Sequence, residues 1–421
     1  MSLFLLFLST FIVADALVWV RGAIRLRKKG ASRVARALFH LFMILQAGSL
    51  AMILGTRSLG LNVDDFLPTY VLVLVYIWHF LLALPTLILH LIGLFWAAAR
   101  AIWRSLAPQR RGFGTMPIIQ PVPVRGRSVS RREFLATTAI LTPPILTLGL
   151  GVLGQRQLSQ VGVRRLTVTL PTLPPALDGL TIAHLSDTHV GRFTHGAVLD
   201  EIVTRTNALK ADLTLFTGDL IDHSLDALPS AVRMLEQIEG PVVVCEGNHD
   251  LFESASQFRE TLKASSGFTT LINEATTLTL RGETVQLLGL RWGGPPSEKR
   301  QRYSEEQMAS SLRDLLALRL PSAFPILLAH HPHAWDHAPG IPLTFAGHTH
   351  GGQFMLTGEL GMGPAMFRYW SGLYTRNDAS GSPSALVVSN GTGNWFPLRV
   401  GAPAEIIHLT LRREAATDGT A

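Results

Sequence analysis

The sequence predicts an N-terminal α-helical membrane region of about four spans, followed by an α/β domain that carries a metal site. Three observations support this fold class. Residues 1–164 contain long apolar stretches separated by arginine-rich loops. In residues 165–421, short apolar runs end in turns of Gly, Asp, Asn and His. The charge also changes sign, from 18 Lys+Arg against 4 Asp+Glu in the first part to 19 against 26 in the second.

Four apolar stretches are near the length of a membrane helix, which needs about 20 apolar residues to cross the hydrocarbon core. The third stretch is longer, and as one helix it would measure roughly 50 Å against about 30 Å of hydrocarbon. We expect one span that continues into the interface, and two half-spans broken at Pro85 are the alternative. The four stretches are Leu3–Val20, Val34–Gly55, Phe66–Ala99 and Phe134–Leu153.

The positions of lysine and arginine predict the orientation of these spans. The loop between the first two stretches and the start of the second stretch together carry seven of them, and the loop between the last two carries eight. The middle loop has only Arg57, together with Asp64 and Asp65. Because positively charged loops stay in the cytoplasm, we expect a multi-pass protein of the cytoplasmic (inner) membrane. Its C-terminal domain then lies on the extracytoplasmic side.

The same features divide the chain into segments. We expect a three-span membrane region at 1–106, a basic Pro-rich cytoplasmic linker at 107–133, a fourth span at 134–154, an α/β domain at 165–413 and a tail at 414–421. Residues 130–135 resemble a twin-arginine signal, which predicts the twin-arginine export machinery as a partner. The alternative is that these arginines are only the positive flank of the fourth span.

The distribution of charge and the histidines of the third stretch argue against nucleic-acid binding and against a transport path. The basic excess belongs to the membrane region, so we expect no nucleic-acid partner. His79 and His90 lie in the third stretch without an acidic residue beside them, and we expect them to be packing or interface residues. We also expect the spans to lack the buried charged pair that a transport path needs.

Five short clusters of Asp, Asn and His each follow an apolar run of strand type. Such strands present these side chains at their C-terminal ends, and five ends side by side would form one rim. Asp, Asn and His are ligands for hard or borderline divalent metals. Two ions about 3.5–4 Å apart can clamp an in-line displacement at phosphorus, and Asp219 has two oxygens with which to bridge them. The clusters are Asp187–His189, Gly218–Asp222, Gly247–Asp250, His330–Pro332 and Gly347–His350.

This ordered set resembles the calcineurin-like metallophosphoesterases over roughly Thr181 to Leu411. The resemblance implies a two-sheet β-sandwich flanked by helices. It also implies two divalent metal ions, such as Mn, Fe or Zn. By the same resemblance the first metal is held by Asp187, His189, Asp219 and His350, and the second by Asp219, Asn248, His330 and His348. The segments Gly347–Gln353 and Phe396–Arg399 look like the bacterial membrane-anchored phosphodiesterase branch of this family.

Two residues receive catalytic roles from the resemblance. His249 becomes the general acid or the donor to a phosphate oxygen, and Asp222 becomes the carboxylate that orients it. The alternative for Asp222 is an acid at a helix N-terminus. We prefer His330 to His331 as a ligand because it comes first after the apolar run. We expect His184 to be a hydrogen-bonded core residue.

The sequence therefore predicts a membrane-anchored, metal-dependent phosphoesterase. The branch resemblance favours a phosphodiesterase, and a membrane location favours a phosphoester substrate that is lipid-linked or part of the cell envelope. One alternative is a phosphomonoesterase or nucleotide hydrolase. Another is a membrane sensor or transport subunit whose outer domain only binds a phosphorylated ligand, although a complete set of ligands argues against it.

Overall fold

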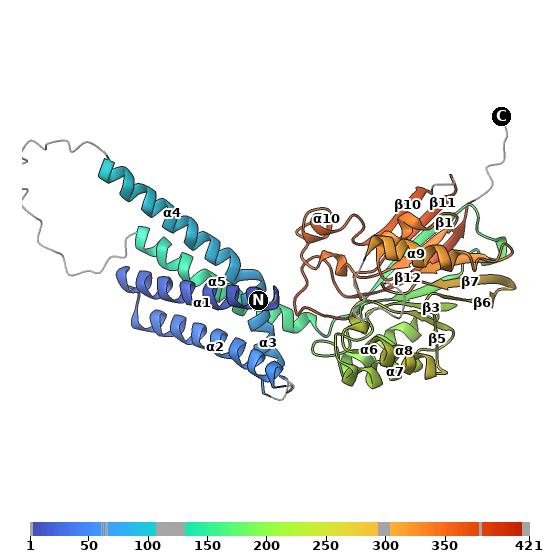
Figure 1. Cartoon of the computed structure of the whole chain (residues 1–421), viewed down its shortest axis with the longest axis horizontal. Helices are drawn as coiled ribbons and strands as arrows, with labels where there is room; N and C mark the ends of the chain where they lie inside the picture. The colour runs from blue at the N-terminus through green and yellow to red at the C-terminus, as the bar shows by residue number, and fades with distance from the viewer. Residues whose placement is uncertain are drawn as a thin grey trace, which may run out of the picture. The chain divides into compact units, whose positions relative to one another are not determined.

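The computed structural model describes residues 3–59, 61, 63, 66–106, 131–293, 304–378 and 381–414. The chain divides into a helical unit, Met1–Leu153, and a unit of mixed sheets and helices, Gly154–Ala421 (Figure 1). Most of the expected linker 107–133 and of the tail 414–421 lies outside the described residues, as does the start of the twin-arginine-like segment.

Long helices lying alongside one another make up the helical unit (Figure 1). Among the described residues, three stretches are long and apolar enough to cross a membrane: Arg33–Thr56, Thr69–Leu106 and Thr137–Gln157. The first helix has 26 residues, but side chains at its start are outside the described residues, so the count of four spans stays a prediction. The elements are α1 (Leu3–Lys28), α2 (Arg33–Ser58), α3 (Thr69–Tyr76), the π-helix η2 (Ile77–Ala83), α4 (Leu84–Leu106) and α5 (Arg131–Gln157).

The third apolar stretch is one continuous helical run rather than two half-spans. The elements α3, η2 and α4 follow one another without a gap from Thr69 to Leu106. The π-helical turn ends just before Pro85, which has no N–H to donate and would clash with an ideal α-helical turn before it. The wider turn therefore accommodates Pro85 without breaking the helix.

The expectation that His79 has no acidic residue beside it is wrong. Asp15 of α1 is buried, and its carboxylate accepts a hydrogen bond from Trp78 Nε1 at 2.7 Å. The other carboxylate oxygen lies 3.0 Å from His79 Nε2. The expectation failed because the acidic partner of His79 comes from a different helix, far away in the sequence. His90 does bond only within its own helix, to the carbonyl of Thr86.

Two six-stranded mixed sheets form the second unit, with strand orders β1-β12-β2-β3-β4-β5 and β10-β11-β9-β8-β7-β6. The strands of the first sheet are β1 (Gly162–Leu170), β2 (Thr181–Leu185), β3 (Leu213–Thr217), β4 (Val242–Cys245), β5 (Thr269–Thr270) and β12 (Glu405–Arg413). Those of the second are β6 (Glu274–Leu280), β7 (Glu283–Gly289), β8 (Phe324–Leu328), β9 (Leu343–Ala346), β10 (Gly372–Asn377) and β11 (Pro383–Val388).

Apolar side chains from both sheets meet in one core, including Ile182 and Leu215 from the first and Ile326 and Phe345 from the second. Helices cover the outer faces, as Figure 1 shows for α6, α7 and α8. The strands before the site are buried on both faces and accordingly consist mostly of apolar residues. The helices are α6 (Ala197–Ala208), α7 (Leu228–Glu236), α8 (Ala255–Ala264), α9 (Glu305–Leu316) and α10 (Met362–Met366). The short helical turns are η3 (Pro175–Leu177), η4 (Leu225–Ala227), η5 (His249–Leu251), η6 (Pro332–His337) and η7 (His350–Gly352).

The expected single rim is in fact made by two sheets. Strands β2, β3 and β4 lie in the first sheet and run parallel, and β8 and β9 lie parallel in the second. Parallel strands end at the same edge, so each sheet presents its polar turns on one side. The two edges face each other, since the backbone N–H of His348 after β9 donates to the carboxylate of Asp187 after β2.

Candidate metal centre

The turns of the site depend on an unusual backbone conformation. Nine non-glycine residues among those described have a positive φ, and five of them are expected ligands. Most side chains avoid this left-handed region because Cβ crowds the backbone, and such residues are found where function demands them. The conformation turns the chain sharply, so that each side chain points back toward the sheet edges. The five are Asp187, His189, Asp219, His348 and His350, with φ between 47° and 72°.

Glycines let the turns approach each other. A Cβ at Gly247 would overlap the carboxylate of Asp219, and one at Gly347 would overlap Ser186 and Asp187. Gly247 and Gly347 are therefore needed for close packing of neighbouring turns.

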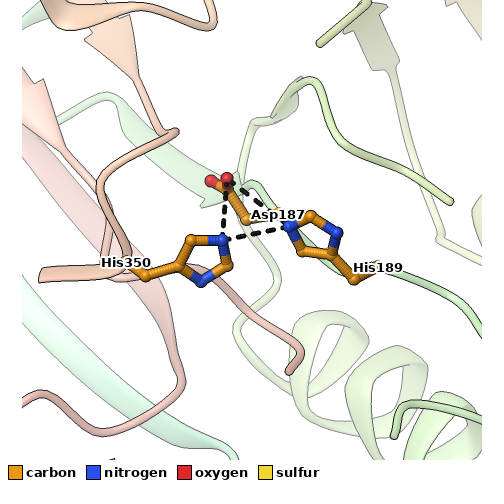
Figure 2. Close-up of side chains that lie close together, drawn as sticks. All are labelled: Asp187, His189 and His350. Carbon is orange, nitrogen blue, oxygen red and sulfur yellow. Dashed lines mark hydrogen bonds and ion pairs between the residues drawn. The ribbon is translucent and has the colours of Figure 1, made fainter. Parts of the chain in front are cut away.

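The first group of side chains is Asp187, His189 and His350 (Figure 2). The Nε2 atoms of the two histidines are 3.0 Å apart, and Asp187 Oδ1 lies 3.4 Å from His350 Nε2. All three side chains are buried. Two imidazole nitrogens and a carboxylate oxygen therefore point at one place, which is the arrangement of ligands around a cation.

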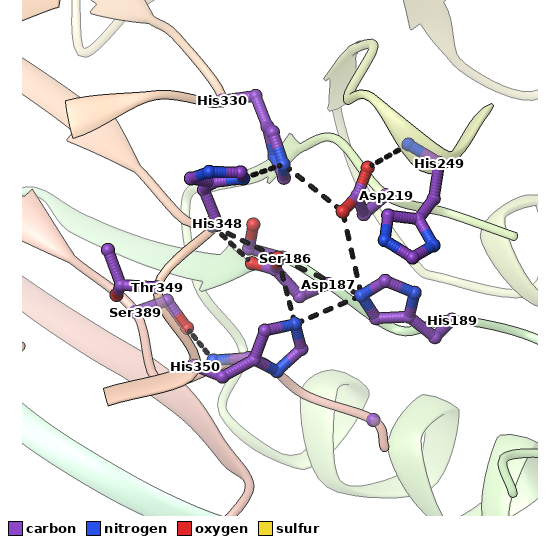
Figure 3. A network of polar contacts seen from close by, with 12 residues as sticks. Ser186, Asp187, His189, Asp219, His249, His330, His348, Thr349, His350 and Ser389 are labelled. Atoms are coloured by element: carbon purple, nitrogen blue, oxygen red, sulfur yellow. Dashed lines mark hydrogen bonds and ion pairs between the residues drawn. The ribbon is translucent and has the colours of Figure 1, made fainter. Parts of the chain in front are cut away.

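The second group gathers around His330 Nε2 (Figure 3). This atom lies 3.2 Å from Asp219 Oδ2, 3.2 Å from Asn248 Oδ1 and 3.2 Å from His348 Nδ1. The same Asp219 oxygen lies 3.5 Å from His189 Nε2 of the first group. One carboxylate oxygen thus faces both groups, and the structure brings all seven expected ligands together.

The chemistry of these atoms fits divalent metal ions. In each of the two groups the His and carboxylate donor atoms lie within 4.8 Å of one another. Burial lowers the pKa of His348 to about 3, and it holds the pKa of His350 well below its usual range. Both imidazoles are therefore neutral near pH 7, which is the form that binds metal.

Asp222 lies between two imidazole rings beside the first group. Its Oδ1 is 3.5 Å from His249 Nδ1 and 3.6 Å from His189 Nδ1. His249 Nδ1 also donates a shorter hydrogen bond, of 2.6 Å, to the backbone carbonyl of Asp222. Burial opposes the charged form of His249, but Asp219 and Asp222 outweigh it and raise its pKa to about 9.

The other histidines occupy different places. His331 stacks beside His348 and Trp292, with ring centroids 4.9 and 5.9 Å away, and its Nδ1 accepts from the backbone N–H of His333. His330, and not His331, therefore faces Asp219. His184 is fully buried and bonded to Thr217 Oγ1, as expected for a core residue.

Asp250 was missed by the sequence analysis. Its buried carboxylate accepts hydrogen bonds from the backbone N–H groups of Asp219, Ile221 and Gly247, at 2.8 to 3.0 Å. It thus ties the turn after β3 to the turn after β4. Its place in the Gly247–Asp250 cluster was the only signal, and that signal did not separate a brace from a ligand.

Arg399 is a second bracing residue that the sequence analysis did not assign. It is buried and donates to the carbonyls of Asn390, Gly393 and Ala402, and one of its nitrogens lies 3.2 Å from His350 Nδ1. Burial lowers its pKa to about 10, so it remains a cation. It fixes the loop behind His350, and the Phe396–Arg399 motif was its only sequence signal.

Residues 180–352, which contain both groups of ligands, match the family model of calcineurin-like phosphoesterases. These residues form a calcineurin-like metallophosphoesterase domain. The chain is 29% identical over 300 residues to the uncharacterized metallophosphoesterase YkuE of Bacillus subtilis, across 68% of this chain and 99% of that one. As a metallophosphoesterase, it is a hydrolase that acts on phosphoester bonds.

Two other relatives have names that mention a membrane or a substrate, and the matched share of each differs. A transmembrane protein with a metallophosphoesterase domain from Danio rerio is 28% identical over 253 residues, or 58% of this chain and 56% of that one. The UDP-2,3-diacylglucosamine pyrophosphatase LpxG of Chlamydia trachomatis is 24% identical over 328 residues, or 64% and 94%. The apolar helices and the transmembrane relative together indicate that this metallophosphoesterase is anchored in a membrane.

Replacing Asp250, which joins the turns after β3 and β4, should destabilise the fold. In Asp250→Asn, an amide N–H would face backbone N–H groups that now donate to a carboxylate oxygen. We expect the free energy of unfolding to fall by about 1–3 kcal/mol, the cost of an unsatisfied buried polar group. Thermal unfolding of the purified protein measures this, with the exposed Asp226→Asn as control. Equal stability of the two variants would contradict the role of Asp250.

Proposed function

We propose that this metallophosphoesterase is a membrane-anchored phosphodiesterase that uses two divalent metal ions, such as Mn, Fe or Zn, on lipid-linked substrates of the cell envelope. The observation that carries the two-metal proposal is Asp219 Oδ2, which faces His330 on one side and His189 on the other. The first ion would be held by Asp187, His189, Asp219 and His350, and the second by Asp219, Asn248, His330 and His348. When bound, such ions lower the pKa of a water molecule and stabilise charge on phosphoryl oxygens.

His249 is proposed as the proton donor to the leaving oxygen. A carbonyl oxygen can only accept, so the 2.6 Å bond to the Asp222 carbonyl places a proton on Nδ1 of His249. Nε2 is then the atom that exchanges a proton with substrate. The Asp222 carboxylate, 3.5 Å from the same Nδ1, favours the protonated ring and holds its orientation. Asp222 is therefore a positioning residue, and the ring-to-carboxylate contact supports the role that the family resemblance implies.

Apolar side chains around the centre support a substrate with an apolar part. Phe252 is 59% exposed, and its ring lies 4.5 Å from that of His249. Trp395 is 41% exposed, and its ring lies 6.0 Å from that of His350. Phe367 lies 6.0 Å from His348. The name of the Chlamydia relative specifies a diacylated substrate, which agrees with an apolar border.

Two alternatives remain from the sequence. A phosphomonoesterase or nucleotide hydrolase would use the same ligands, and activity on a panel of mono- and diesters separates it from a diesterase. The sensor or transport alternative is favoured by one observation, the buried pair of Asp15 and His79 in the helical unit. We prefer an enzyme to a sensor because all seven expected ligands converge, which a domain that only binds ligand does not require. The branch resemblance alone favours a phosphodiesterase over a phosphomonoesterase.

Replacing Asp219 should remove metal and activity together. An amide in Asp219→Asn keeps the size of the side chain but loses the charge that would hold two cations. We expect most of the bound metal and the phosphoesterase activity to disappear, whereas Asp226→Asn should keep both. Metal analysis of the purified variants provides the measurement. Two ions per chain in Asp219→Asn would show that the bridging assignment is wrong.

Replacing His249 should slow the reaction without removing metal. General acids typically contribute about 10²- to 10⁴-fold, so His249→Ala should lose activity of that order on an alkyl diester. The loss should shrink for a nitrophenyl ester, whose leaving group needs no proton. Activity and metal content are compared with His195→Ala, a change of an exposed histidine. If His249→Ala lost metal, or slowed both substrates equally, the proton-donor role would have to be abandoned.

The proposed orientation puts the metal centre outside the cytoplasm, by way of twin-arginine export or of the fourth span alone. Single cysteines near Lys28 and Arg110 should then be shielded from an impermeant thiol reagent, and one at Asp226 should react. Labelling of spheroplasts, in which no outer membrane intervenes, measures this. Cys245 is buried and adds no background. Labelling in the opposite sense would place the enzyme in the cytoplasm.

A further inference from the structure

A segment beside the metal centre exposes several large apolar side chains to solvent. It comprises residues 355–366, which we call the apolar flap: a hairpin closed by Met355 and Gly361, followed by α10. Figure 1 shows α10 outside the two sheets. The exposed fractions are 80% for Leu356, 61% for Leu360, 47% for Met362 and 62% for Met366. Such a patch next to a site marks an interaction surface.

Hydrogen bonds tie the apolar flap to the end of a membrane helix. Met355 N–H donates to the carbonyl of Val400 at 2.7 Å, and Arg399 N–H donates to Gln157 Oε1 at 2.9 Å. Gln157 is the last residue of the candidate span Thr137–Gln157. The carbonyl of Leu158 also accepts from Asn394 Nδ2 at 3.3 Å. The loop that braces the apolar flap is therefore bonded to the residues where the span ends.

The short connection between the end of the candidate span and β1 agrees with these hydrogen bonds. Four residues separate Gln157 from the start of β1 at Gly162, and they reach at most about 14 Å when extended.

Trp395, in the bracing loop, is partly exposed, and tryptophan is enriched at membrane interfaces. Arg368 follows α10 and lies 3.6 Å from Asp336 Oδ2, but its side chain is 66% exposed and can still meet anionic headgroups. Glu359, the acid within the apolar flap, lines a neighbouring cavity of about 720 Å³.

We propose that the apolar flap docks into the bilayer that the span crosses. Leu356, Leu360, Met362 and Met366 enter the acyl-chain region, and Trp395 lies at the interface. The metal centre then opens at the membrane surface, because the apolar flap begins three positions after the turn Gly347–Gly352 ends and the Trp395 ring lies 6.0 Å from that of His350. This inference goes beyond the proposed substrate, since a bilayer contact does not depend on which phosphoester is hydrolysed.

Fluorescence quenching by lipid tests the docking directly. The full chain is reconstituted in vesicles of phosphatidylethanolamine and phosphatidylglycerol, with an environment-sensitive fluorophore on Leu356→Cys or Met366→Cys. The control is Leu318→Cys, since Leu318 is a 47% exposed leucine just beyond α9. Nitroxides on the lipid acyl chains should remove most of the emission at the two apolar flap positions and leave the control bright. Equal quenching at all three positions, or none, would overturn the proposal.

A second variant separates docking in the bilayer from contact between two copies of the chain. Leu356→Asp combined with Leu360→Asp should abolish quenching of the Met366→Cys label and leave hydrolysis of a soluble nitrophenyl diester unchanged. Leu318→Asp with Leu320→Asp should change neither measurement. Crosslinks between two copies through Leu356→Cys, without lipid quenching, would show that a second copy covers the surface and would refute the membrane docking. Quenching needs no turnover, so a failed phosphodiesterase proposal would leave this result unaffected.

Discussion

The burial of three carboxylates in one small space is the constraint on which the site depends. Asp187, Asp219 and Asp250 are each 2% exposed or less. Burying charge is costly unless hydrogen bonds and opposite charges compensate it. Asp250 receives three backbone N–H groups, whereas Asp187 and Asp219 receive one N–H donor each and face imidazole nitrogens. Asp187 Oδ1 and Asp219 Oδ2 also lie within 3.5 Å of imidazole nitrogens, so a cation bound there would complete the charge balance.

The fold supplies the rigidity that this arrangement requires. Parallel strands deliver the turns of each sheet to one edge, and the shared apolar core keeps the two edges facing each other. The left-handed backbone at Asp187, Asp219 and His350 is costly in isolation, so the packed turns must maintain it. Glycines 247 and 347 permit the close approach, and Asp250 and Arg399 hold the loops from behind. Ligands, glycines and braces therefore form one cooperative unit.

The amino-acid sequence was sufficient to predict which turns meet, because apolar strand patterns and metal-binding residue types coincide there. Apolar runs that end in turns of Gly, Asp, Asn and His predicted which side chains would meet, because a buried parallel strand must stop before a polar side chain can point outward. It was insufficient wherever a contact joins distant segments. The pairing of Asp15 with His79 requires knowledge of which helices touch, and the division of one expected rim into two sheets requires the strand order. The brace Asp250 shares its motif with ligands, so only its hydrogen bonds reveal its part.

The central claim is that two metal ions share Asp219. Electron paramagnetic resonance of the wild-type protein loaded with Mn²⁺ tests it most directly, since two ions about 3.5–4 Å apart interact magnetically through a bridging ligand. The account predicts a spectrum of exchange-coupled pairs at saturation, with close to two ions bound per chain. A spectrum of isolated Mn²⁺, or saturation at one ion per chain, would contradict it.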